Sequence, residues 1–85
     1  MVEIVDPRNP TAKEVQVGWH LDGSRLVPVY WPTGRYTEGE SGSVGGTWTG
    51  YSYVSYRHES GFSDTLKGHQ IEALRELGIM RPATS

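Results

Sequence analysis

The sequence predicts an α+β domain in which a small antiparallel sheet of three to four strands is covered on one face by a single C-terminal helix. Three observations predict it: an alternating apolar pattern over residues 14–31, a run of aromatic and β-branched residues over 47–58, and a helical pattern that ends before Pro82. The chain of 85 residues is expected to form a single small domain, because this length supports only one hydrophobic core.

Residues 1–13 are predicted to form an extended N-terminal arm. Pro7 and Pro10 exclude a helix there and exclude a central strand across them. The short apolar stretch that contains Val2 and Ile4 has two interpretations, either an added edge strand or part of a disordered tail. The polarity of the arm does not decide between them.

Residues 14–31 are predicted to form a β-hairpin, because apolar side chains occupy alternate positions in both halves. These side chains are Val15, Val17, Trp19 and Leu21 in the first half and Val27, Val29 and Trp31 in the second. A two-residue Asp22-Gly23 loop would put the two sets on opposite faces, whereas a three-residue loop over 21–23 would pair Val17 with Val27. We therefore expect the three-residue loop, which contains Leu21, with the other apolar side chains of the hairpin on the core face and Pro28 facing outward on an edge strand.

Residues 37–46 are predicted to be a flexible loop, because glycines are frequent there and apolar residues are few. A further strand is expected over residues 47–58, where β-forming residues predominate. Alternation puts Trp48, Ser52, Val54 and Tyr56 on the core face and Thr49, Tyr51, Tyr53, Ser55 and Arg57 on the other face. Aromatic side chains are therefore expected on both faces of this strand.

The last element is predicted to be a helix that begins near Ser63 or Asp64, either of which would serve as its N-cap. Its apolar side is formed by Leu66, Gln70, Ala73, Leu74 and Leu77, with Ile71 at the margin. Gly78 is expected to end the helix in the left-handed conformation, with Ile79 in apolar contact with Leu74.

Charge and composition exclude several classes of protein. The formal net charge is -2 and no basic stripe is present, so a general attraction to nucleic-acid backbones is not expected. The absence of cysteine excludes disulfides, thiolate zinc sites and thiol nucleophiles, and it favours a reducing compartment. No apolar run is long enough to span a bilayer and the N-terminus lacks the pattern of a signal peptide, so a cytoplasmic protein is expected.

No combination of residues has the spacing of a catalytic, metal or cofactor site. The Gly-rich segment runs into a predicted strand rather than a helix, and it lacks the Lys-Ser or Lys-Thr of a phosphate loop. The histidines are His20, His58 and His69, and their spacing matches no metal motif. His58, Glu59 and Ser60 include the residue types of a hydrolase triad, but neighbours at a strand end point in different directions and are expected to form a turn. We therefore expect no enzymatic activity, no metal and no cofactor.

The sequence favours a non-enzymatic module that binds another protein or assembles with itself. The predicted contact residues are Tyr51, Tyr53 and Arg57, since tyrosine and arginine are enriched at interfaces, together with Arg35 and His20. In a second interpretation the two tyrosines are half-buried strand residues that the N-terminal arm covers. The alternative function is single-stranded nucleic-acid binding, with bases stacked on the aromatic strand. The expected setting is a small bacteriophage or bacterial accessory protein that acts as an inhibitor, adaptor or assembly component, located in the host cytoplasm or the virion if a phage encodes it.

Overall fold

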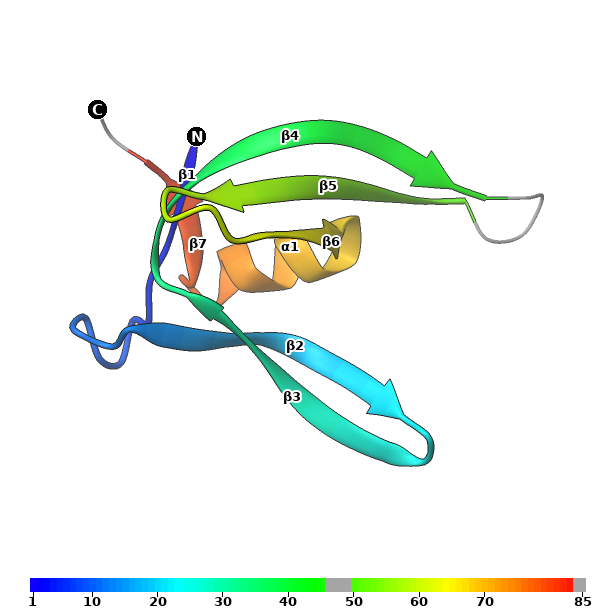
Figure 1. The fold of residues 1–85 in the computed structure, drawn as a ribbon, viewed down its shortest axis with the longest axis horizontal. Helices are drawn as coiled ribbons and strands as arrows, with labels where there is room; N and C mark the ends of the chain where they lie inside the picture. The colour runs from blue at the N-terminus through cyan, green and yellow to red at the C-terminus, as the bar shows by residue number, and fades with distance from the viewer. Residues whose placement is uncertain (46–49, 84–85) are drawn as a thin grey trace.

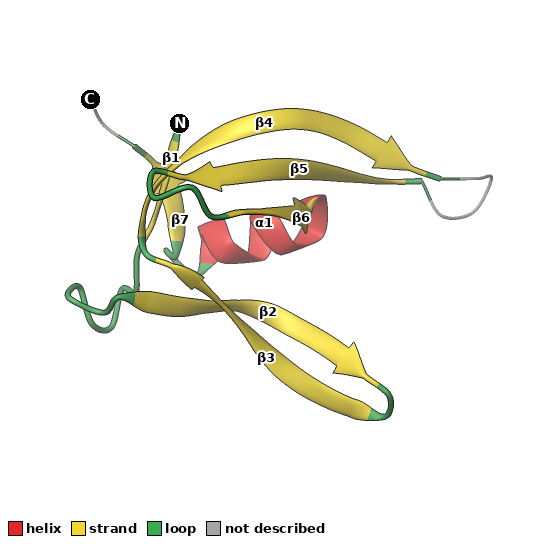
Figure 2. Ribbon diagram, viewed as in Figure 1, coloured by secondary structure: helices red, strands yellow, loops and turns green. Residues whose placement is uncertain are grey.

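A five-stranded antiparallel sheet, a separate two-stranded hairpin and one helix make up the fold (Figures 1 and 2). The computed structural model describes residues 1–45 and 50–83. Its elements are β1 (Val2–Ile4), β2 (Glu14–Asp22), β3 (Arg25–Pro32), β4 (Gly34–Val44), β5 (Tyr51–His58), β6 (Ser63–Lys67), α1 (Gly68–Glu76) and β7 (Met80–Pro82). The predicted α+β class is confirmed, with more strands than the three to four expected. The predicted strand residues Trp48 and Thr49 and the last loop residue, Gly46, lie outside the described residues.

Helix α1 lies between the five-stranded sheet, whose order is β6-β5-β4-β1-β7, and the β2–β3 hairpin (Figure 1). The buried core between them consists of Val2, Ile4, Val15, Val17, Trp31, Tyr36, Tyr56, Leu66, Ile71, Leu74, Ile79 and Met80. The ring of Trp31 stacks on Tyr36 with a centroid separation of 5.4 Å and meets Tyr56 edge-on at 6.0 Å. Because aromatic side chains bury large areas, Trp31 is the main apolar connection between the base of the hairpin and the sheet.

Strand β1 lies in the interior of the sheet, between β4 and β7. This position corrects both interpretations of the predicted arm, because its first residues form neither an edge strand nor a disordered tail. Val2 and Ile4 are 5% and 0% exposed. Their burial depends on Met80–Pro82, the strand at the other end of the chain, so it could not be deduced from the local pattern.

A two-residue turn at Gly23 and Ser24 joins β2 and β3, in place of the expected three-residue loop. Gly23 has a φ of 63°, which suits a two-residue hairpin turn because glycine adopts positive φ without strain. With this turn Leu21 lies opposite Leu26 and Trp19 opposite Pro28. The pairing of Val17 with Val27 that we expected is therefore wrong.

A β-bulge between Gln16 and Gly18 shifts the register of the hairpin by one residue. Below the bulge Val15 lies opposite Trp31, and both are buried. Beyond the bulge Trp19 and Val27, which were expected in the core, are 59% and 37% exposed. The bulge thus brings only the base of the hairpin into the core.

Residues 37–44 belong to strand β4, so the flexible loop predicted over 37–46 is wrong for this part of the segment. The glycines of β4 leave room for side chains of the neighbouring strand β5. A Cβ on Gly42 would lie 2.9 Å from Cζ of Tyr53, and one on Gly39 would lie 3.3 Å from Cβ of Ser55. The low side-chain volume that suggested a loop is therefore what lets β5 pack against β4.

Strand β6 occupies Ser63–Lys67, so the predicted N-cap at Ser63 or Asp64 is wrong. Leu66, expected on the helix, is buried in β6 opposite Val54. The helix begins at Gly68, and the backbone N–H of Lys67 donates to Oε1 of Gln70 at 2.9 Å.

The predicted end of the helix is confirmed. Gly78 has a φ of 78°, the N–H of Ile79 donates to the carbonyl of Leu74 at 2.9 Å, and the N–H of Gly78 donates to the carbonyl of Arg75 at 3.1 Å. These two bonds are the Schellman pattern. Leu77, which we expected on the packed side of the helix, is instead 63% exposed.

Candidate functional site

The distal half of the β2–β3 hairpin carries an exposed apolar surface, which we call the hairpin face. It consists of Trp19, Leu21, Leu26 and Tyr30, which are 59%, 62%, 65% and 50% exposed. Single exposed apolar residues are common on folded proteins, but contiguous groups of large ones mark interaction sites. Figure 1 shows that this half of the hairpin extends away from the rest of the molecule.

The register explains why these side chains lie together. Leu21 is directly opposite Leu26, and Trp19 is directly opposite Pro28. Because side chains alternate along each strand, Trp19, Leu21 and Leu26 lie on one side of the hairpin together with Pro28. Tyr30 follows two residues after Pro28 on the same strand and shares that side. The opposite side of the distal half carries His20, Val27 and the charged pair at the turn.

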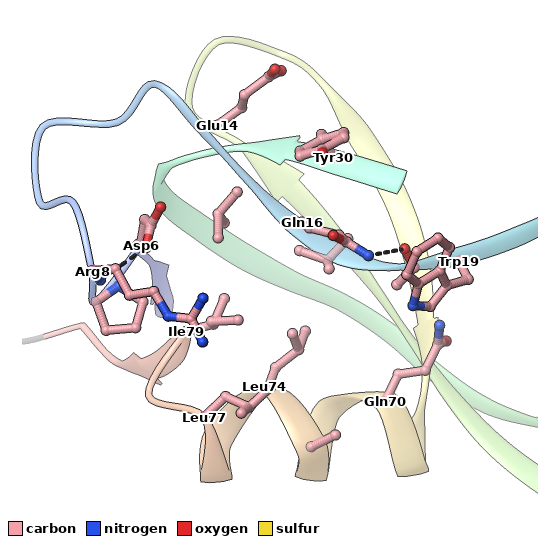
Figure 3. A pocket seen from close by; sticks show the side chains of 15 residues that line it. Asp6, Arg8, Glu14, Gln16, Trp19, Tyr30, Gln70, Leu74, Leu77 and Ile79 are labelled. Atoms are coloured by element: carbon pink, nitrogen blue, oxygen red, sulfur yellow. Dashed lines mark hydrogen bonds between the residues drawn. The ribbon is translucent and has the colours of Figure 1, made fainter. Parts of the chain in front are cut away.

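A groove of about 720 Å³ separates β2 from α1 (Figure 3). Its floor contains the buried side chains Val15, Val17, Leu74 and Ile79, and Leu77 lies on the helix side. Trp19 and Tyr30 line the groove as well as the hairpin face. The groove and the hairpin face therefore adjoin each other through these two side chains.

Polar side chains lie at both ends of the groove (Figure 3). At one end Gln70 approaches Gly18 so closely that a Cβ on the glycine would lie 3.0 Å from Nε2 of the glutamine. At the other end lie Asp6, Arg8 and Glu14, and the backbone N–H of Arg8 donates to the Asp6 carboxylate at 2.9 Å. The groove thus has an apolar centre, with an amide group at one end and charged groups at the other.

The predicted contact residues Tyr51, Tyr53 and Arg57 share the face of the five-stranded sheet that points away from the helix, as alternation with the buried Tyr56 requires. We call this surface the outer sheet face. Tyr51 is 38% exposed, and Nζ of Lys67 lies 4.9 Å from the centre of its ring. Tyr53 is half-buried because its ring covers Gly42. The N-terminal residues do not cover these tyrosines, since β1 pairs at the other side of β4.

Arg35 also lies on the outer sheet face, where it lines a hollow of about 460 Å³ with Arg57, Thr37 and Glu59. Outside this hollow but on the same sheet face, Arg81 forms an ion pair with Glu3 at 3.0 Å. His20 lies elsewhere, on the exposed hairpin. The structure therefore brings four of the five predicted contact residues to one sheet face and separates the fifth from them.

The hairpin face and the groove are sites that sequence reasoning missed. Trp19 was assigned to the core and Leu21 to the loop, because the register was taken from the apolar pattern alone. The available signal was Gly23-Ser24, a dipeptide that suits a two-residue hairpin turn. That turn would have placed Leu21 and Leu26 opposite each other near the tip.

His58 and Ser60 lie together, contrary to the expectation that the residues of this turn would point apart. Nδ1 of His58 is 2.6 Å from Oγ of Ser60 and accepts the backbone N–H of Ser60 at 3.0 Å. Nε2 donates to the carbonyl of Thr33 at 3.0 Å, and the imidazole is buried against Tyr36. Backbone groups of Ser60 and Thr33 occupy the two ring nitrogens of His58. The His58 side chain therefore joins the end of β5 to the connection between β3 and β4.

Burial raises the pKa of Tyr36 to about 12, and its hydroxyl donates to the carbonyl of Pro32. The pKa of Tyr56 is raised by burial and by the nearby Glu38 carboxylate, which outweigh the opposite effect of Arg75. Both groups belong to the core. Within residues 1–45 and 50–83, no group of three or more histidine, aspartate or glutamate side chains is placed to hold a metal ion. No helix in this part of the chain is long and apolar enough to cross a membrane.

No known protein family matches this sequence, and neither a curated protein nor a solved structure shows detectable similarity to it.

Proposed function

We propose that this protein is a non-enzymatic interaction module that binds a protein partner through the hairpin face. The observation that supports it is the exposure of Trp19, Leu21, Leu26 and Tyr30 on one side of a projecting hairpin. Large apolar side chains in water cost free energy, and contact with a partner removes that cost. Tryptophan and tyrosine are also the residues that most often dominate binding energy at protein interfaces.

The surface fits a protein better than a polyanion. Leucine side chains offer no charge or hydrogen bond to phosphate, and the charged residues at the hairpin turn, Asp22 and Arg25, balance each other. A role as an inhibitor, adaptor or assembly component of a phage or bacterial system, acting in the cytoplasm, accords with a small domain that offers one binding surface.

Affinity capture with a matched variant tests this proposal. The tagged protein is immobilised, incubated with lysate of its source cells with and without nuclease, and compared with the Leu21→Ser/Leu26→Ser double variant. Both leucines are exposed, so the variant is expected to keep its stability within about 0.5 kcal/mol. A nuclease-resistant protein recovered by the wild type and lost by the variant supports the proposal. Equal recovery by the two proteins contradicts it.

A second candidate function is binding of single-stranded nucleic acid by the outer sheet face. Four cationic side chains, Arg35, Arg57, Lys67 and Arg81, lie on that face with Tyr51 and Tyr53. Aromatic rings beside cations can stack bases and neutralise phosphates. The Tyr51→Ser/Tyr53→Ser variant is the matched control: nuclease-sensitive material lost only in this variant, with an affinity that falls steeply with salt, favours the second candidate.

A further inference from the structure

We infer that the groove between β2 and α1 accepts an extended segment of the partner protein, which adds as a new strand to the free edge of β2. This inference rests on the proposed function, and it names the chemistry of the partner: a β-strand whose apolar side chains at alternate positions enter the groove.

The groove runs along the edge of β2. Six consecutive residues, 14–19, line it, whereas Tyr30 is the only lining residue from β3. A groove over the face of a strand would contact alternate residues, because side chains alternate between faces. Contact with every residue in turn indicates that the groove borders the edge of the strand.

That edge has unpaired backbone groups. Within the described residues β2 pairs with β3 alone, and no backbone hydrogen bond from another element reaches it. The N–H of Thr33 donates to the carbonyl of Lys13, so the alternation of antiparallel pairs places the backbone groups of Gln16 on the side away from β3. The backbone groups of Trp19 point the same way, because the two-residue turn makes Asp22–Arg25 a hydrogen-bonded pair and alternation then makes Trp19–Pro28 a non-bonded pair.

The free edges of β2 and β3 differ in how well they could hydrogen-bond to an added strand. On the free edge of β3, Pro28 and Pro32 remove two of the donors that an added strand would need. Proteins protect exposed strand edges in this way, with proline or with charged side chains. On β2 the positions 15–19 hold neither proline nor a charged residue. The hairpin is therefore blocked by proline on one edge, whereas the edge that borders the groove carries only the β-bulge at Val17.

The groove would bind the side chains of an added strand, and the edge of β2 would bind its backbone. A strand added beside β2 would direct every second side chain toward Leu74, Leu77 and Ile79. Leu77 is 63% exposed although it lies one turn after the buried Leu74, and an added strand would cover it. Strand addition thus accounts for an exposed leucine that neither the sheet nor the hairpin covers.

A random dodecapeptide library displayed on phage and selected on the immobilised protein provides the probe. Enriched peptides are expected to carry apolar residues at alternate positions. When such a synthetic peptide is added to the ¹⁵N-labelled protein, the amide signals of Gln16 and Trp19 should shift and exchange more slowly with solvent. No enrichment, enriched sequences without alternation, or signals that shift elsewhere on the molecule would overturn the inference.

Two variants separate strand addition from other binding. Gln16→Pro removes the edge donor and should weaken peptide binding at least tenfold, whereas Gln16→Ala keeps the donor and should not. Leu77→Asp, at an exposed position, should weaken binding at least tenfold and keeps the inference testable if Gln16→Pro does not fold. Unchanged affinity in the folded variants contradicts strand addition. So does a concentration-dependent dimer that both variants abolish, because a second copy would then occupy the groove.

The failure of this inference differs from the failure of the proposed function. If the natural partner is lost with Leu21→Ser/Leu26→Ser but binds normally to Gln16→Pro and Leu77→Asp, the hairpin face binds the partner without strand addition. If none of these variants affects the partner, both proposals are wrong.

Discussion

Nε2 of the buried His58 donates a hydrogen bond to the carbonyl oxygen of Thr33 at 3.0 Å, which links the end of β5 to the connection between the hairpin and the sheet. We expect His58→Ala to lower the free energy of unfolding by about 2–3 kcal/mol, because it leaves a carbonyl unsatisfied and removes the edge-on contact with Tyr36. Ser60→Ala should cost less than about 1 kcal/mol, since Ser60 is exposed. Urea unfolding of both variants measures the difference, and equal losses would contradict this assignment.

Gly34 has a φ of 132°, and a Cβ there would lie 2.8 Å from Nε2 of His58. We expect Gly34→Ala to destabilise the protein by about 2–4 kcal/mol, because it combines backbone strain with a clash against a buried ring. Gly50→Ala is the matched control, since Gly50 has no atom within 4 Å of such a Cβ. Thermal unfolding of the two variants should show a large decrease for the first alone.

Gly78 ends the helix in the left-handed conformation. Gly78→Val should lower the free energy of unfolding by about 1–2 kcal/mol, because a β-branched residue is strained at positive φ. Denaturant unfolding with Gly50→Ala as the reference checks the value. A variant as stable as the wild type would show that the Schellman end contributes nothing.

Tyr36 makes stability dependent on alkaline pH. Its folded-state pKa of about 12 is raised above the ordinary value of 10.0, so folding favours the neutral phenol. The contribution of the neutral Tyr36 phenol to the free energy of unfolding is complete below about pH 10, and it is lost as the pH rises through the folded-state pKa. Tyr36→Phe should cost about 1 kcal/mol near pH 8, through the lost bond to Pro32, and this deficit should shrink by pH 11. Urea unfolding at both pH values tests it, and a constant deficit would contradict the assigned pKa.

Local patterns in the sequence predicted the fold class, the hairpin, the aromatic strand and the helix end. The Gly78-Ile79 signal succeeded because a Schellman motif depends on residues within one helical turn. The interior position of β1 could not be predicted, because it depends on pairing between Val2–Ile4 and Met80–Pro82. Strand β4 was missed because its glycines are explained only by residues of the neighbouring strand β5, such as Tyr53 opposite Gly42.

The candidate site was predicted less well than the fold. The faces of Tyr51, Tyr53 and Arg57 followed from alternation, and the structure places them as expected. The hairpin face depended on the register, and a single bulge at Val17 reversed the orientation of the distal β2 residues, Trp19 and Leu21, relative to Val15. A shift of one residue is invisible in the apolar pattern, yet it moves Trp19 from the expected core to the surface.

Binding of a protein partner through the hairpin face is tested most directly by the equilibrium affinity of the captured partner. This affinity is measured for the wild type and for the Leu21→Ser/Leu26→Ser variant and compared. Loss of the two leucine contacts together is expected to cost at least about 1.4 kcal/mol, or about tenfold in affinity. We expect at least a tenfold weaker affinity in the double variant, with unchanged stability and an affinity that depends little on salt. An unchanged affinity, or one that depends steeply on salt and on Tyr51 and Tyr53, would contradict it.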